Sequence, residues 1–143
     1  TFYRGRNAKI HEWTCVSEDK RQAVGMIMQE LTQPNHPTEQ YFPKGLDAPK
    51  RYEFTNRSMR YSILGFGDLV NAVSPVHIKQ DSLVHQVLAK CVTMPGEIES
   101  YRASGSVLMA GVKLTQGFAA TGYSEETRYF PDFASRMYFM KQI

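Results

Sequence analysis

The residues best suited to metal chemistry are few and scattered along this sequence. A zinc site needs several Cys and His ligands at short, paired spacings. His11 and Cys15 are four residues apart, which would place both on one face of a helix, but two ligands do not make a site. The remaining candidates show no recognised ligand spacing: His36, His77, His85 and Cys91. We therefore predict no metal site.

Patterns that activate a nucleophile or hold a cofactor do not occur in a convincing form. Ser106 follows a glycine, yet the Gly-x-Ser-x-Gly pattern of a strained strand-to-helix turn does not surround it. The run Gly65-Phe66-Gly67-Asp68 lacks the third glycine of a dinucleotide-binding fingerprint. The sequence thus predicts no catalytic residue and no cofactor from its motifs.

Positive charge and aromatic residues gather in one segment. Residues 44–60 hold five Lys or Arg against two Asp or Glu, which equals the net charge of +3 of the whole chain. Arginine neutralises phosphate and aromatic rings stack on bases, so the segment is a candidate contact for single-stranded nucleic acid or RNA. The candidate residues are Lys50, Arg51, Tyr52, Arg57 and Arg60. The alternative is an amphipathic strand with its aromatic side chains in the core.

A surplus of large aromatic residues points to a partner-binding surface. Two of them, Tyr41 and Phe42, lie in a proline-rich stretch, and four more lie near the C-terminal end: Tyr129, Phe130, Tyr138 and Phe139. Aromatic residues and Met are enriched where proteins meet. The alternative is a last helix that packs these residues into its own core.

Two short runs resemble the site of mono-ADP-ribosyltransferases. These are Phe2-Tyr3-Arg4-Gly5 near the start and Glu97-Ile98-Glu99 later in the chain. The resemblance implies that Arg4 grips NAD and that Glu99 is catalytic. The middle Ser-Thr-Ser motif of that family has no clear counterpart here, and Tyr61-Ser62 is a poor match for it.

The periodicity of apolar residues predicts three amphipathic helices. The first covers about residues 17–32, with Ser17 as N-cap and apolar residues at i, i+3, i+4 and i+7. The second covers about residues 81–92, capped by Asp81 or Ser82, with Cys91 on its apolar side. The third begins at Pro131.

Strands and one long loop fill the rest of the expected fold. Residues 2–16 suit one or two short strands, and residues 51–64 alternate as a strand that turns at Asn56-Arg57. The apolar stretch from Val107 suits a buried strand. Prolines at about residues 33–50 predict a long surface loop. We expect one compact α+β domain over residues 1–143, with a mostly antiparallel sheet packed by about three helices.

Composition limits the cell compartment and the class of protein. The first residues lack the apolar core of a signal peptide, and the apolar run at 107–112 is far shorter than the roughly 20 residues of a membrane helix. Two distant cysteines suit a reducing compartment, so we expect a cytoplasmic protein with no membrane contact.

These features together favour a non-enzymatic binding or assembly protein. It would contact other copies of itself, a protein partner, or single-stranded nucleic acid or RNA. Small structural proteins of viruses and mobile elements share this profile. The question of an enzyme stays open, with an NAD-dependent mono-ADP-ribosyltransferase-like protein as the alternative.

Overall fold

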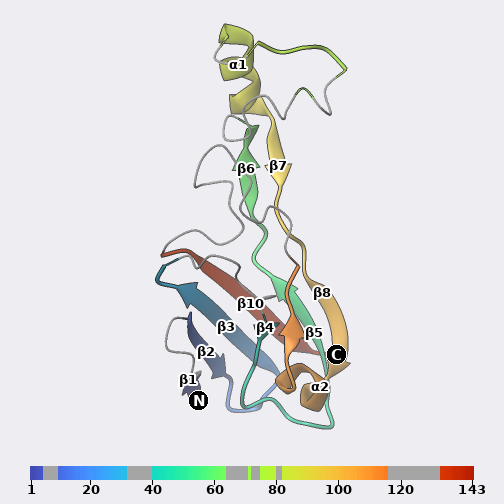
Figure 1. Cartoon of the computed structure of the whole chain (residues 1–143). Helices are drawn as coiled ribbons and strands as arrows, with labels where there is room; N and C mark the ends of the chain where they lie inside the picture. The colour runs from blue at the N-terminus through green and yellow to red at the C-terminus, as the bar shows by residue number, and fades with distance from the viewer. Residues whose placement is uncertain (5–9, 32–39, 64–70, 72–74, 80–81, 116–132) are drawn as a thin grey trace. The chain divides into compact units, whose positions relative to one another are not determined.

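The computed structural model describes residues 1–4, 10–31, 40–63, 71, 75–79, 82–115 and 133–143, with the backbone alone for residues 2–4 and 94. In these residues it contains ten strands and two short helices (Figure 1). The fold is therefore mostly β, and the prediction of an α+β domain with three amphipathic helices is wrong. The chain divides into two compact units, which we describe separately.

Unit 1 comprises Thr1–Arg57, Ile98–Gln116 and Phe130–Ile143 and is built on a six-stranded sheet. Its strands follow the order β1-β2-β3-β10-β5-β8, and every neighbouring pair is antiparallel. They are β1 (Phe2–Arg4), β2 (Ile10–Val16), β3 (Gln22–Gln29), β10 (Ser135–Gln142), β5 (Arg51–Asn56) and β8 (Ser100–Ser104). The expectation of one or two strands near the start is confirmed by β1 and β2.

A second, smaller layer covers one face of this sheet. It consists of β4 (Gln40–Tyr41), paired antiparallel with β9 (Val112–Lys113), and of helix α2 (Gly105–Met109). In Figure 1 these elements lie in front of the large sheet. The described residues with the least exposed apolar side chains line the space between the layers: Ile27, Tyr41, Tyr52, Phe54, Leu108, Leu114, Tyr138 and Met140.

Tyr41 is the main contact between the two layers. Its ring stacks on that of Tyr138 at a centroid distance of 5.1 Å, and Phe54 stacks on Tyr138 at the same distance. Its hydroxyl lies 2.7 Å from Oγ1 of Thr14 and donates to the carbonyl of Trp13 at 3.0 Å. Burial raises the pKa of Tyr41 well above its ordinary value, so the hydroxyl stays protonated.

The segment predicted as the first helix is the central strand β3. Its even and odd residues face opposite sides of the sheet, with Ala23 and Ile27 buried and Val24 and Met26 half-buried. Because both faces of β3 are apolar, its sequence is a nearly continuous apolar run. In such a run some apolar residues also fall at the i, i+3, i+4 and i+7 positions of a helix, which led to the wrong prediction.

The segment predicted as the third helix is strand β10, which lies between β3 and β5. Alternate residues Arg136, Tyr138 and Met140 are buried, which is the period-two pattern of a strand. The predicted start of that helix at Pro131 lies outside the described residues. The expected buried strand from Val107 is also wrong, because residues 105–109 form α2 and only Val112–Lys113 is extended.

Unit 2 comprises Ser58–Glu97 and Gly117–Tyr129. In its described part, β6 (Arg60–Ser62) pairs antiparallel with β7 (Thr93–Pro95), and α1 (Leu83–Cys91) precedes β7. This confirms the predicted second helix, and Ser82 caps it by accepting the N–H of His85 at 3.2 Å. The expected hairpin at Asn56-Arg57 does not form, because β5 and β6 belong to different sheets.

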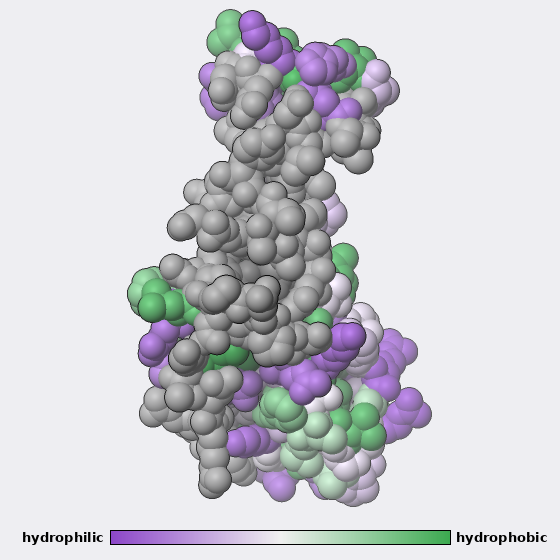
Figure 2. Space-filling model, viewed as in Figure 1, coloured by the Kyte–Doolittle hydropathy of each residue, from purple (hydrophilic) through white to green (hydrophobic). Residues whose placement is uncertain are grey.

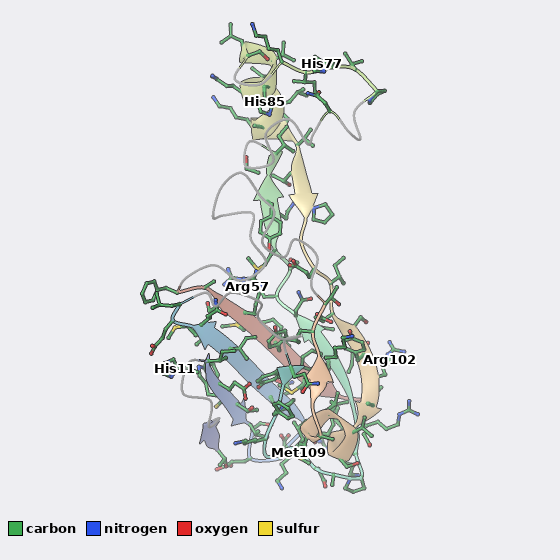
Figure 3. All side chains as sticks on the ribbon, in the orientation of Figure 1. His11, Arg57, His77, His85, Arg102 and Met109 are labelled. Atoms are coloured by element: carbon green, nitrogen blue, oxygen red, sulfur yellow. The ribbon has the colours of Figure 1, made fainter. Side chains whose placement is uncertain are left out.

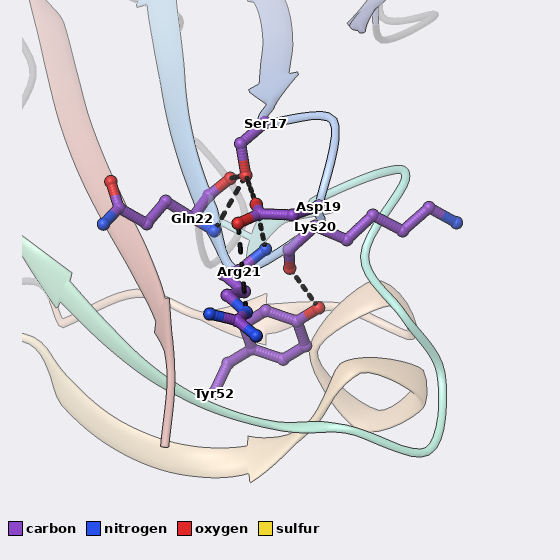
Figure 4. A network of polar contacts seen from close by, with 6 residues as sticks. All are labelled: Ser17, Asp19, Lys20, Arg21, Gln22 and Tyr52. Carbon is purple, nitrogen blue, oxygen red and sulfur yellow. Dashed lines mark hydrogen bonds and ion pairs between the residues drawn. The ribbon is translucent and has the colours of Figure 1, made fainter.

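The turn between β2 and β3 is fastened to the core by Tyr52 (Figure 4). Lys20 adopts a positive φ of 55°, and its carbonyl accepts a hydrogen bond of 2.7 Å from the Tyr52 hydroxyl. The same hydroxyl accepts the N–H of Asp47 at 3.0 Å. Within the turn, Asp19 accepts from the N–H of Arg21 at 3.0 Å and from the Ser17 hydroxyl at 2.7 Å.

A helix that crosses a membrane must be long and predominantly apolar. Within the ranges given above, neither helix has the length or the hydropathy for such a span.

The Asp19 turn generates a pH-dependent prediction. The Arg21 N–H and the Ser17 hydroxyl lower the pKa of Asp19 below its ordinary value of 3.8, so the ionised form stabilises the fold above that value. This contribution is lost as the pH falls through the lowered pKa of the folded state. Asp19→Asn should therefore reduce the urea midpoint at about pH 6, and the difference from wild type should vanish at about pH 2. Glu18→Gln, outside the network of Figure 4, is the control, and a pH-independent difference would contradict the assignment.

The close contact between β3 and Tyr41 generates a second prediction. A Cβ atom at Gly25 would lie 1.7 Å from the hydroxyl oxygen of Tyr41. Gly25→Ala should lower the free energy of unfolding by about 2–3 kcal/mol, because the core is overpacked there. In a Tyr41→Leu background the same change should cost much less, since the shorter side chain ends before the clash. Equal costs in both backgrounds, measured by urea unfolding, would show that Tyr41 is not the obstacle.

Candidate functional site

A groove lies at one side of unit 1. We call it the β8 groove; it lies between the edge strand β8, helix α2 and strand β9, and its volume is about 680 Å³. Its lining consists of Tyr101, Arg102, Ala103, Val107, Leu108, Gly111, Val112, Lys113, Leu114 and Thr115. Strand β8 closes the sheet on this side and pairs only with β5 in the six-stranded order.

A tight turn positions the two walls of the β8 groove. Helix α2 ends at Met109, and the chain then reverses at Gly111, whose φ of +122° suits glycine and few other residues. A Cβ atom there would also lie 2.7 Å from the ring of Phe42. The turn sends Val112 and Lys113 into β9, where they pair with β4.

One end of the β8 groove is held by the buried Glu99. Its carboxylate accepts the backbone N–H of Thr115 and, at 3.3 Å, the Thr115 hydroxyl. Its own N–H donates to Oδ1 of Asn56 at 2.9 Å. Glu99 thereby ties the segment after β9 to the end of β5.

Tyr101 stands beside this carboxylate at the mouth of the groove. Its ring is partly exposed, and its hydroxyl makes a long hydrogen bond of 3.4 Å to the carbonyl of Lys113. Burial and then the hydrogen bond with Glu99 raise the pKa of Tyr101, so the hydroxyl is protonated near neutral pH.

An ion pair fixes the guanidinium at the outer rim. Glu53 and Arg102 are directly opposite on β5 and β8, and Oε1 of Glu53 accepts from Nε and Nη2 of Arg102 at 3.0 and 2.8 Å. The pair is largely exposed, so its worth to stability is about 0–1 kcal/mol. The ion pair fixes the position of the Arg102 guanidinium at the sheet edge. Figure 3 shows the Arg102 side chain pointing outward.

Helix α1 of unit 2 presents a second surface. Leu83, Val84 and Val87 are 80, 62 and 60% exposed, and Cys91 is exposed on the same side. We call these four residues the α1 stripe. The sequence placed Val84, Val87, Leu88 and Cys91 on one face. Leu88 is half-buried and the other three are exposed to solvent, whereas His85 on the other side is buried. Figure 2 shows small apolar patches among the hydrophilic surface near α1.

The residues predicted to contact nucleic acid differ in exposure and belong to two units. Tyr52 is fully buried under the β2–β3 turn, whereas Lys50, Arg51 and Arg57 are exposed on unit 1. Arg60 belongs to unit 2, where its Nε donates to Oγ1 of Thr93 at 2.6 Å. The aromatic side chains of β5, Tyr52 and Phe54, point into the core and offer no stacking surface beside Arg51.

The aromatic residues predicted to bind a partner divide in the same way. Tyr41 and Tyr138 are core residues, with 0 and 2% exposure, while Phe42 and Phe139 are each 39% exposed. Tyr129 and Phe130 lie outside the described residues.

The two halves of the expected NAD site are far apart. Arg4 lies on β1 and Glu99 directly precedes β8, and these are the opposite edge strands of the six-stranded sheet. Five strand spacings of about 4.8 Å separate them, or about 24 Å in all. The two residues cannot share one cleft.

The histidines and cysteines of the described residues hold no group of three metal-ligating side chains. His11 and Cys15 lie on strand β2, where four residues span about 13 Å. Nε2 of His11 lies 2.6 Å from Oε1 of Glu30 instead. Both cysteines are free and exposed.

Comparison with known proteins decides the family. The model of the glycosyl hydrolase family 36 C-terminal domain matches residues 10–140. The chain belongs to this family. A comparison with curated proteins finds no match.

Solved structures of α-galactosidases share the fold of this chain. The α-galactosidase of Lactobacillus brevis has a TM-score of 0.56 at 20% identity and covers 99% of this chain. AgaA of Geobacillus stearothermophilus has a TM-score of 0.54 at 21% identity, and the galactosidase domain of AgaSK one of 0.53 at 13%. This chain spans only 14, 13 and 13% of their respective lengths. At these identities the likeness concerns the fold alone.

Membership of a glycosyl hydrolase family corrects the functional predictions made from sequence. The expectation of a non-enzymatic binding or assembly protein of viral or mobile-element type, with nucleic acid as a partner, is wrong. The ADP-ribosyltransferase alternative is wrong too, because a different family matches nearly the whole chain. The basic-aromatic pattern that suggested nucleic acid is the amphipathic strand β5.

Sequence reasoning missed the residues that line the β8 groove. Nothing in the sequence pattern distinguishes Tyr101, Arg102 and Lys113 from ordinary surface residues. Glu99 next to the groove was noticed in the sequence, but as the catalytic residue that the resemblance to mono-ADP-ribosyltransferases implies.

The Glu99 contact generates a prediction on local dynamics. Glu99→Ala removes the acceptor of the Thr115 N–H, so the amide hydrogen of Thr115 should exchange at least about tenfold faster. Glu30→Ala, which removes an exposed carboxylate elsewhere in unit 1, is the matched control. Hydrogen exchange followed by NMR measures both, and unchanged protection of Thr115 would contradict the role given to Glu99.

Proposed function

We propose that this chain serves as the C-terminal domain of an enzyme that hydrolyses α-galactosides, and that it packs against the rest of that enzyme through the α1 stripe. Family membership supports the enzyme class, and the solved structures of the same fold are described as α-galactosidases. The hydrolysis itself belongs to the part of the enzyme outside this chain.

The observation that carries the proposal is the exposure of the α1 stripe. An amphipathic helix normally turns its apolar face to the core, yet three residues of this face are at least 60% exposed. A contiguous exposed apolar patch marks an interaction site, whereas single exposed residues need no explanation. The outer face of the large sheet is less exposed than the α1 stripe, because its apolar residues Trp13, Val24 and Met26 are only partly exposed. The α1 stripe is therefore the better candidate for an interface.

The length of the related enzymes indicates the occupant. This chain corresponds to 13–14% of those proteins, so most of such an enzyme is available to cover an exposed apolar helix. Two exposed thiols, Cys15 and Cys91, suit a reducing compartment, so we also propose a cytoplasmic setting.

The test is binding to a hydrolase that lacks its own C-terminal domain. The Lactobacillus brevis α-galactosidase without that domain is mixed with this chain, and association is measured by analytical ultracentrifugation together with α-galactosidase activity. We expect a one-to-one complex with a gain of activity or thermal stability. Leu83→Glu/Val87→Glu should weaken the complex at least about tenfold, because each buried apolar contact is replaced by a desolvated charge.

The control variant is Gln86→Glu, which adds charge to an exposed position of the same helix outside the stripe. Failure of the wild-type chain to bind, or equal binding by Leu83→Glu/Val87→Glu, would contradict the proposal. Formation of a homodimer through the stripe in place of the complex would contradict it as well.

A further inference from the structure

We propose that the β8 groove binds a neutral saccharide unit, so that this domain contacts carbohydrate independently of the rest of the enzyme. The class of ligand rests on the proposed function, but the argument for the site comes from the groove itself.

The floor and the mouth of the groove suit the apolar face of a sugar ring. Leu108, Val112 and Leu114 are 2, 7 and 2% exposed and form an apolar base. The Tyr101 ring is 39% exposed at the mouth, where a flat aromatic surface can cover the C–H face of a pyranose. The volume of about 680 Å³ lies within the usual range for small-molecule sites, about 300–1,000 Å³.

The rim supplies the hydrogen-bonding groups that sugar hydroxyls need. The Tyr101 hydroxyl makes only a long hydrogen bond of 3.4 Å to the carbonyl of Lys113, so it can also meet a sugar hydroxyl. The exposed Lys113 and Thr115 side chains lie on the opposite wall.

The charge around the groove favours a neutral ligand over an anionic one. Lys113 contributes one positive charge to the groove, the neighbouring Glu99 contributes one negative charge, and Arg102 is neutralised by Glu53, so the formal sum is zero. A phosphate or carboxylate site would instead gather unpaired cations. Hydroxyl groups both donate and accept hydrogen bonds, which matches the hydroxyls of Tyr101 and Thr115 and the ammonium of Lys113.

The experiment is an NMR titration of the full chain with galactose and with raffinose, and with galacturonate as the anionic comparison. We expect saturable shifts at Tyr101, Arg102 and Thr115 with a dissociation constant of about 1–10 mM, and weaker binding of galacturonate. Tyr101→Ala should weaken binding at least about tenfold, because it removes the aromatic surface at the mouth of the groove. Val107→Arg should do the same by filling the groove from a residue that is 59% exposed and therefore free to change without harm to the core.

Two controls separate this inference from the proposed function. Lys141→Ala, an exposed residue on β10 away from the groove, should leave binding unchanged. Leu83→Glu/Val87→Glu should also bind sugar normally, so loss of docking and loss of sugar binding are independent results. The inference is overturned by shifts that do not saturate, by shifts located elsewhere, by tighter binding of galacturonate, or by normal binding in Val107→Arg.

Discussion

The contact of Tyr41 with the large sheet is the interaction on which the rest of unit 1 depends. The hydroxyl reaches Thr14 and Trp13 on β2 while the ring stacks on Tyr138 of β10, so one side chain joins the second layer to two strands of the first. Strand β4 in turn pairs with β9 through Tyr41 and Val112. The wall of the β8 groove formed by β9 is therefore positioned by a residue that does not line the groove.

The same contact explains why β3 was misread from sequence. Gly25 is present because the Tyr41 hydroxyl occupies the place of its side chain, and this cause lies 16 residues further along the chain. Viewed locally, Gly25 only weakens a helix, and the apolar residues on either side fit a helical period. Strand β10 was misread for a similar reason, since its place between β3 and β5 comes from pairings across the whole sequence. Local patterns were sufficient to predict α1 and β2. The N-cap of α1 and the alternation of buried residues in β2 both lie within a few neighbouring residues.

The candidate site was less predictable than the fold, and for a physical reason. A groove exists only where two layers end beside each other, so Tyr101 and Lys113 acquire a shared role from the pairing of β8 with β5 and of β9 with β4. Their spacing of 12 residues carries no motif. Glu99 could be noticed as an acid in a β region, but its burial and its bond to Thr115 make it a positioning residue for the groove wall.

Burial also decides which aromatic residues are available for recognition. The rings or hydroxyls of three buried tyrosines make contacts within the core: Tyr41, Tyr52 and Tyr138. These aromatic residues therefore connect layers and turns and are not available to a ligand. A domain of this composition can still present an aromatic surface at an edge strand, where one side of the strand has no neighbour to cover it. Tyr101 on β8 meets that condition, whereas Tyr52 one strand further in does not. Position in the strand order, more than residue type, thus separates the tyrosine that can meet a ligand from those that build the fold.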